Sequence, residues 1–146
     1  MHDNSDEYFM REALREAGKA ADEGEIPVGA VIVAGGSIIA RAHNQTERLN
    51  DVTAHAEMVA ITAAADYLGA KYLNDCTLYV TLESCVMCAG AIGWSQLGRI
   101  VYGAADPKRG FTQLTPSPLH PKTEVASGIL ADECSALVKD FFKKKR

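Results

Sequence analysis

The stretch TLESCVMCAGAI, residues 81–92, contains two cysteines in a Cys-x-x-Cys arrangement, Cys85 and Cys88. This spacing lets both sulfurs reach one metal ion from a single turn of backbone. Zinc is bound by Cys and His ligands at about 2.0–2.3 Å in a tetrahedral arrangement. The stretch therefore predicts part of a zinc site at the point where an apolar helical pattern begins.

A second segment, TAHAEM at residues 53–58, supplies the imidazole of His55 and the carboxylate of Glu57. Three protein ligands and one open position describe a catalytic zinc site, whereas four protein ligands describe a structural one. His55 and the two cysteines make three, and Glu57 is left over. The count predicts a catalytic zinc site with a spare carboxylate, which points to hydrolysis.

Both segments lie where a helix is expected to begin. A helix N-terminus carries partial positive charge, which lowers a thiol pKa and favours metal-binding thiolates. Two helices that follow adjacent strands would present both N-termini to the same point. Bound zinc would acidify a water molecule, and Glu57 would take its proton and return it to the substrate. The expected reaction is attack of hydroxide on an electron-poor carbon with loss of ammonia.

Three other interpretations compete with this one. Cys85 and Cys88 could form a redox pair, although redox motifs of the thioredoxin type do not need an upstream His-x-Glu. A closed structural zinc site would need a fourth ligand, for which Cys76 and His43 are the nearby candidates, and neither has a matching spacing. The pattern could also be accidental.

The chain of 146 residues is long enough for one domain with a hydrophobic core, so residues 1–146 are expected to form a single zinc-dependent domain. No run approaches the roughly 20 apolar residues of a membrane span. The acidic N-terminus lacks the pattern of a signal peptide. Cys76 and Cys134 are expected to be buried, reduced thiols. These features favour a cytoplasmic protein without a membrane partner.

Charge is distributed unevenly along the chain. Residues 1–98 hold 6 Lys/Arg and 14 Asp/Glu, a balance of −8, whereas residues 99–146 hold 9 and 5, a balance of +4. The basic end, Lys143 to Arg146, is compatible with a phosphate-binding surface on an acidic protein. Cations that complement the dipole of a solvated helix end would give the same pattern.

Periodicity and turn residues predict alternating strands and helices, which is typical of an α/β layered domain. Asn4 and Glu7 resemble a capping box, and Gly35-Gly36 predicts a hairpin turn. Gly98 is expected to end the third helix. The expected helices cover 5–23, 54–68, 86–97 and 131–145, and the expected strands 28–33, 37–42, 76–82, 99–103 and 122–126.

With these motifs in view, the chain resembles the cytidine/deoxycytidylate deaminase superfamily, whose signature is His-x-Glu followed by Pro-Cys-x-x-Cys. It is most similar to the bacterial branch that converts the wobble adenosine of an arginine tRNA to inosine. The likeness extends over nearly the whole chain, including residues 27–31, 43–44, 53–57, 78–83, 85–91 and 128–134.

The resemblance implies a three-layer α/β/α fold with a central five-stranded mixed sheet. It implies one Zn²⁺ per chain, held by His55, Cys85 and Cys88, with Glu57 as the proton shuttle. Five further positions are implied to contact the RNA: Asn44 and the backbone of Ala56 on the flipped base, Val28 packed against it, Asp106 at a neighbouring ribose, and Phe142 with the basic tail near the anticodon backbone. From the sequence alone, Asn44 and Asp106 could equally be turn residues, and Val28 and Phe142 core residues.

The chain departs from the family pattern at three places. Ser84 stands where the family has proline, and its hydroxyl is expected to cap the following helix. The loop 111–121 lacks the family's Asn-His-Arg stretch, which leaves RNA contacts from this loop open. Residues 94–96, Trp-Ser-Gln, replace a more basic pattern.

Three functions remain open. The favoured one is deamination of adenosine in a tRNA anticodon stem-loop. Deamination of a free base such as guanine or cytosine shares the same ligands, although free-nucleoside cytidine deaminases typically have cysteine where this chain has His55. A silent zinc scaffold that only binds RNA would have no use for Glu57. The expected helix over 86–97 is apolar on most sides, which, with the family's habit, predicts a homodimer.

Overall fold

The computed structural model describes residues 2–145. The helices are α1 (His2–Asp22), α2 (Ala56–Leu68), α3 (Val86–Ser95), the short 3-10 helix η1 (Phe111–Gln113) and α4 (Ala131–Lys145). The strands are β1 (Gly29–Ala34), β2 (Ser37–His43), β3 (Cys76–Leu82), β4 (Arg99–Ala104) and β5 (Glu124–Ser127). Within residues 2–145, no helix has the length and apolar character needed to cross a membrane.

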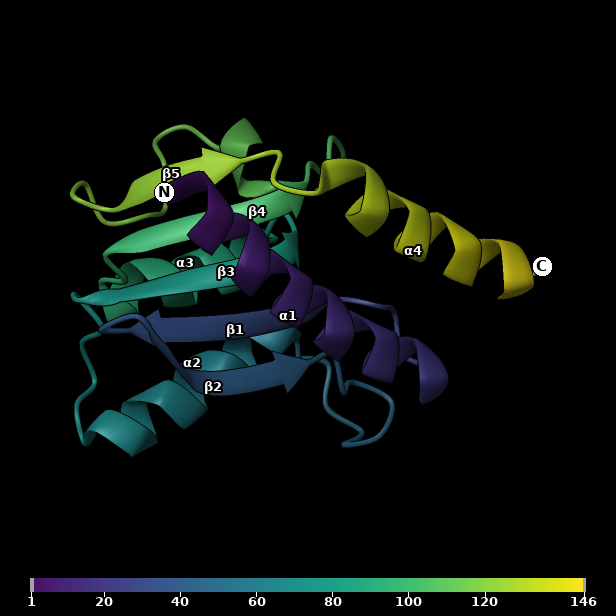
Figure 1. The fold of residues 1–146 in the computed structure, drawn as a ribbon, viewed down its shortest axis with the longest axis horizontal. Coiled ribbons are helices and arrows are strands. Elements are labelled where there is room, and N and C mark those ends of the chain that lie inside the picture. The colour runs from purple at the N-terminus through teal and green to yellow at the C-terminus, as the bar shows by residue number, and fades with distance from the viewer. Residues whose placement is uncertain (1, 146) are drawn as a thin grey trace.

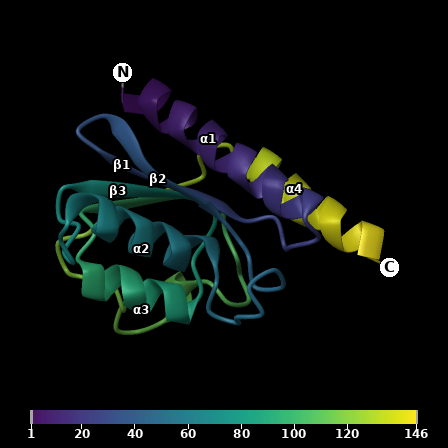
Figure 2. The ribbon, with the colours of Figure 1, turned by 90° about the horizontal axis from the view of Figure 1, so that it is seen from below.

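The five strands form one mixed sheet in the order β2-β1-β3-β4-β5. Strand β1 pairs antiparallel with both β2 and β3, whereas β3, β4 and β5 run parallel. Helices α1 and α4 cover one face, and α2 and α3 cover the other (Figures 1 and 2). This arrangement confirms the predicted three-layer α/β/α fold with a central five-stranded mixed sheet.

Both faces of the central strands β1, β3 and β4 are largely buried, because a pair of helices covers each face of the sheet. Along β1, Ala30 and Ile32 face the core beneath α2 and α3, while Val31 and Val33 face the core beneath α1 and α4. Strands that are buried on both faces have continuous apolar sequences rather than an alternation of apolar and polar residues. The run of small and β-branched residues in β1 fits this position.

The ends of two predicted helices differ from expectation. Helix α1 begins at His2, so Asn4 lies inside the helix and the predicted capping box at Asn4 is wrong. Helix α3 ends at Ser95, because Gln96 adopts a left-handed conformation at φ 56°. Gly98, which was expected to end α3, instead allows a close approach to the carbonyl oxygen of Asn74, which a Cβ atom would block.

The prediction that the two ligand-bearing helices follow adjacent strands is also wrong. Helix α2 follows β2, and α3 follows β3, but β1 lies between these two strands. The hairpin at Gly35 pairs β1 with β2 and leaves the other edge of β1 for β3. The long loop 44–55 leaves β2 beside the first residue of β1, Gly29, and leads to the start of α2.

Candidate metal centre and active-site pocket

Three potential metal ligands from two distant segments meet at the N-termini of α2 and α3. The Nδ1 atom of His55 lies 3.7 Å from the sulfur of Cys85 and 3.3 Å from that of Cys88. All three ligand atoms lie within 4.8 Å of one another. Tetrahedral zinc with ordinary bond lengths would separate a nitrogen and a sulfur ligand by roughly 3.5 Å. The spacing therefore fits one zinc ion without rearrangement of the backbone.

His55 and Cys85 each occupy the N-cap position of a helix. Both have extended backbones, with φ/ψ of −70°/153° and −75°/177°, and neither side chain bonds to the first turn of its helix. An N-cap side chain usually accepts a hydrogen bond from that first turn. Here both side chains project instead toward the shared point. Cys88, one turn further along α3, is fully buried.

The three ligand side chains form one hydrogen-bonded network that shifts their pKa values. Hydrogen bonds with Cys88 and His55 lower the pKa of Cys85 to about 3. The reciprocal bond to Cys85, together with burial, raises the pKa of Cys88. The bond to Cys85 also raises the pKa of His55. A divalent cation that displaces these protons would gain two thiolates and a neutral imidazole, which together offset its charge.

Glu57 lies in the first turn of α2, beside this cluster, and is 4% exposed. Its Oε2 accepts a hydrogen bond of 2.7 Å from the hydroxyl of Ser84. Burial raises the pKa of Glu57, and the Ser84 bond opposes this effect. The prediction that Ser84 caps α3 is wrong, because Cys85 is the N-cap residue and the Ser84 hydroxyl turns toward Glu57.

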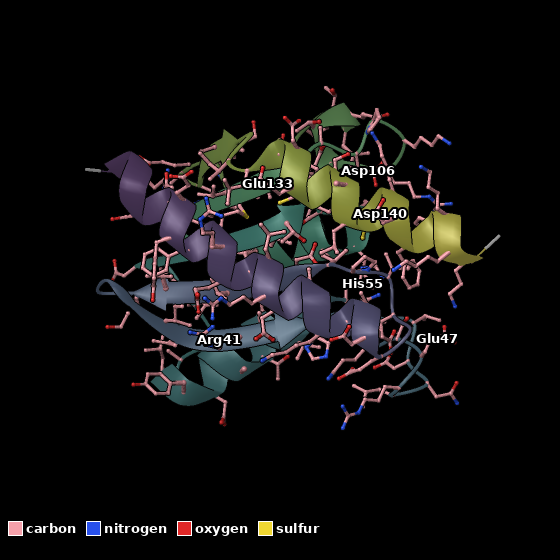
Figure 3. All side chains as sticks on the ribbon, turned by 45° about the vertical axis from the view of Figure 1, so that its right-hand side comes forward. Arg41, Glu47, His55, Asp106, Glu133 and Asp140 are labelled. Atoms are coloured by element: carbon pink, nitrogen blue, oxygen red, sulfur yellow. The ribbon has the colours of Figure 1, made fainter. Side chains whose placement is uncertain are left out.

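A pocket opens beside the cluster, at the end of the sheet where β2, β3 and β4 finish. In α/β sheets, ligands commonly bind outside the carboxyl ends of parallel strands. Figure 3 shows His55 and Asp106 at this end, together with the loop that carries Glu47. The pocket is lined by Ile26, Val28, Asn44, His55, Ala56, Glu57, Leu82, Glu83, Cys85, Asp106 and Arg109.

Four of the five predicted substrate contacts therefore share the pocket with the ligand cluster: Val28, Asn44, Ala56 and Asp106. Val28 is half-buried and packs against the core, as its core interpretation predicted, and it also lines the pocket. Phe142 lies on α4, outside the pocket lining, and is 45% exposed. The structure places Phe142 on the surface rather than with the other four.

Asn44 has the strongest signature of a ligand contact. It is 6% exposed, and its backbone N–H donates to the carbonyl of Val28 at 3.0 Å. Among the described residues, its side-chain oxygen is the one buried polar side-chain atom without a hydrogen-bond partner. Such an atom costs free energy unless something else satisfies it. Its position in the lining places this oxygen where a molecule in the pocket could reach it.

Two buried carboxylates hold the loops that frame the pocket. Glu25 accepts hydrogen bonds from the backbone N–H groups of Glu47 at 3.0 Å and Arg48 at 2.8 Å. Glu83 accepts bonds from the backbone N–H groups of Asp106 at 2.9 Å and Thr112 at 3.0 Å. No local sequence pattern marks either anchor, because each accepts bonds from a loop 22 or more positions away.

Arg109 is a lining residue that sequence reasoning missed. Asp106 organises this part of the loop, because its Oδ1 accepts the backbone N–H groups of Lys108 and Arg109 at 3.1 Å. The turn interpretation of Asp106 is therefore correct for its side chain, while the residue still lines the pocket. The Asp-Pro pair at 106–107 signalled the turn but not that the exposed Arg109 borders the pocket.

The proposed fourth ligands of a closed zinc site lie elsewhere. Cys76 is buried at the start of β3, the end of that strand away from Cys85. The ring of His43 lies between two carboxylates, 3.4 Å from Glu16 and 3.0 Å from Glu23. Among the side chains described between residues 5 and 145, the metal cluster comprises only the original three.

Comparisons with known proteins agree with this geometry. Residues 3–104 match the family described as the cytidine and deoxycytidylate deaminase zinc-binding region. The tRNA-specific adenosine deaminase of Bacillus subtilis (strain 168) is 46% identical over 146 residues, covering 97% of this chain and 91% of that protein.

Two solved structures extend the comparison. One, from a study of A-to-I editing by tRNA:A34 deaminases at the wobble position of transfer RNA, is 43% identical with a TM-score of 0.84, covering 89% of this chain and 98% of that one. Guanine deaminase from Bacillus subtilis is 44% identical with a TM-score of 0.65, covering 68% and 64%. The chain belongs to the zinc-binding cytidine and deoxycytidylate deaminase family, within its group of tRNA-specific adenosine deaminases.

Proposed function

We propose that this zinc-dependent deaminase converts adenosine to inosine at the wobble position of an arginine tRNA anticodon. The observation that carries the proposal is the shared pocket, in which the ligand cluster, Glu57 and the unpartnered Asn44 oxygen meet. The similarity to tRNA-specific adenosine deaminases over nearly the full chain supports the substrate class. The net reaction consumes water and adenosine and releases ammonia and inosine.

Glu57 is proposed as the catalytic proton carrier. Zinc, when held by His55, Cys85 and Cys88, supplies a water molecule that ionises near neutral pH. The Glu57 carboxylate lies in the same pocket, so it can take the proton of that water and deliver it to the purine and its departing amine. Its burial keeps bulk water from competing for this proton.

The remaining lining residues are proposed to hold the flipped base. The side-chain amide of Asn44 is fixed by burial and can hydrogen-bond the purine. The apolar side chain of Val28 offers a packing surface, and the backbone at Ala56, the first residue of α2, can contact the reacting edge. Asp106 lies at the pocket wall, where a neighbouring ribose would pass.

Helix α4 is proposed to bind the anticodon backbone. It extends beyond the sheet at the end where the loop 44–55 lies (Figure 1). Its last turn carries Lys143, Lys144 and Lys145, and Phe142 beside them is 45% exposed. Lysines bind phosphates through charge, and an exposed ring can stack on a base.

We also propose that residues 1–146 act as one catalytic domain in a cytoplasmic homodimer. Helix α3 buries Cys88, Ala89 and Ile92 against the sheet, yet Val86 is 61% exposed and Trp94 is 85% exposed on its outer side. Large exposed apolar side chains on one helix are typical of an interaction surface. Sedimentation should give a dimer for the natural chain and a shift to monomer for Trp94→Asp; a wild-type monomer would contradict the proposal.

The substrate is tested with two reactants offered to the same zinc-loaded protein. One is a synthetic arginine-tRNA anticodon stem-loop with adenosine at the wobble position, and the other is free guanine. We expect inosine in the RNA and no conversion of guanine. A stem-loop with the adenosine moved one position should remain unmodified, and RNA binding should weaken steeply as salt is raised. Conversion of guanine without conversion of RNA would instead support the free-base alternative.

A further inference from the structure

Ser84 is the residue that replaces the family proline, and it is 1% exposed between β3 and α3. Its hydroxyl donates to Oε2 of Glu57 across 27 positions of sequence, at 2.7 Å. A hydrogen bond of this length to a carboxylate belongs to the strong, charge-assisted kind. Proline has no hydroxyl and cannot make it.

The backbone around Ser84 is held from both sides. Its carbonyl accepts the N–H of Phe111 at 3.0 Å, and Phe111 is buried against Tyr102. The preceding residue, Glu83, donates its N–H to the carbonyl of Ala104 at 2.9 Å and anchors the neighbouring loop through its carboxylate. The Ser84 hydroxyl is thus presented to Glu57 from a fixed frame.

We propose that Ser84 is a positioning residue for catalysis, which restricts the rotation of the Glu57 carboxylate through the bond to its Oε2. The terminal torsion of a glutamate side chain is broad, so a carboxylate with no fixed partner samples many orientations. Small displacements of a reacting group cost large factors in rate. The bond to Oε2 restricts this rotation. The inference rests on the proposed role of Glu57 as proton carrier.

The direct test is a set of variants of the zinc-loaded protein, Ser84→Ala and Ser84→Thr, assayed on the substrate that the wild type converts. Ser84→Ala should lower kcat about tenfold with KM within about twofold, because orientation rather than binding is lost. Ser84→Thr keeps the hydroxyl and should recover most of kcat. An alanine variant with wild-type kcat would overturn the proposal.

A matched control separates positioning from ordinary loss of a buried hydroxyl. Ser95, the last residue of helix α3, is also buried and donates to the carbonyl of Ile92 at 2.9 Å, away from the pocket. Ser95→Ala should lower the thermal midpoint by a few degrees, as Ser84→Ala does, but leave kcat unchanged. Equal losses of kcat in both variants would assign the Ser84 effect to general loosening and contradict the proposal.

A thermal double-mutant cycle tests the contact without any activity. Ser84→Ala should lower the midpoint by a few degrees in the natural chain and by much less when Glu57→Ala has removed the acceptor. Equal shifts in both backgrounds would show that the hydroxyl does not act through Glu57. Zinc content is measured for every variant and should stay at one per chain. If the wild type converts guanine but not RNA, the proposed substrate fails, while the same variants assayed on guanine still decide the role of Ser84.

Discussion

The two carboxylates that hold the pocket loops, Glu25 and Glu83, and the pocket carboxylate Glu57 are all buried, but their hydrogen bonds differ. Glu83 accepts three bonds, from the N–H of Asp106 and from the N–H and hydroxyl of Thr112. Glu25 accepts two backbone N–H groups and a longer bond from Thr46. Glu57 accepts a bond from the Ser84 hydroxyl and also interacts with its own backbone N–H and with Cys88 of the ligand cluster, so none of its partners lies in a distant loop.

This difference separates two uses of the same side chain. A carboxylate whose oxygens are filled by backbone N–H groups serves as an anchor, because any proton it gains breaks bonds that order a loop. A carboxylate whose partners belong to the metal site itself, rather than to a loop, can exchange a proton without releasing a loop.

The largest effect is expected for Glu57→Gln. The amide has the same shape but cannot accept the proton of the attacking water, so turnover should fall by about 10² to 10⁴. Zinc should remain bound, because Glu57 is outside the ligand cluster. Single-turnover measurement of inosine, with zinc analysis of the same sample, checks both points. Turnover within twofold of the wild type would remove Glu57 from the mechanism.

Glu83→Gln should cost stability rather than chemistry. One amide NH₂ group would face the N–H of Asp106 or of Thr112, and a buried donor would lose its acceptor. We expect the free energy of unfolding in urea to fall by about 2–3 kcal/mol. Gly110→Ala offers an independent probe, since an added Cβ would collide with the Glu83 carboxylate. A loss below about 0.5 kcal/mol for both variants would refute the anchor role.

The stabilisation of the fold by the anchor Glu25 should depend on pH. Burial raises its pKa, but the N–H groups of Glu47 and Arg48 and the Thr46 hydroxyl lower it by more, so the pKa lies below its ordinary value of 4.5. A depressed pKa means that the stabilisation is present above pH 4.5 and is lost as the pH falls through the folded-state pKa.

The measurement for this anchor compares the wild type with Glu25→Gln by urea unfolding from pH 7 to pH 3. The wild type should be more stable by about 1–2 kcal/mol at pH 7, and the gap should narrow below pH 4.5. A gap that stays constant across this range would show that ionised Glu25 does not stabilise the fold.

The smallest effect is expected for Thr112→Val. Thr112 is exposed, and its hydroxyl bond to Glu83 at 2.7 Å is the outermost of the three. Its loss should cost about 0.5–1 kcal/mol in the natural chain and close to nothing when Glu83→Gln is already present. An equal loss of unfolding free energy with and without Glu83→Gln would show that the Thr112 hydroxyl does not act through Glu83.

Much of the fold was predictable because its elements carry strong local signals. Strand β3 has the predicted limits, 76–82, and the spacing of Met10, Ala13, Ala17 and Ala20 in α1 gives four fully buried side chains. The strand order was not predictable in the same way. It depends on which edge of β1 receives β3, a long-range choice that the hairpin signal at Gly35 leaves open.

The candidate site shows the same contrast between residues with a local sequence signal and residues whose partners are distant in sequence. Cys85 and Cys88, with His55, could be identified because their types and spacing have few uses other than binding a metal. The role of Ser84 could not, because a serine before a helix usually caps it, and its true partner lies 27 positions away. Arg109 was missed because the direction of a side chain from an irregular loop has no sequence period.

X-ray absorption at the zinc edge tests the central claim most directly. The zinc-loaded protein should show two sulfur neighbours at about 2.3 Å and two lighter neighbours at about 2.0 Å, one from His55 and one from solvent. Addition of a stem-loop carrying a hydrolysis-analogue base at the wobble position should alter the solvent neighbour and leave the sulfurs unchanged. A third sulfur or a second imidazole would mean a closed structural site and would contradict the proposed chemistry.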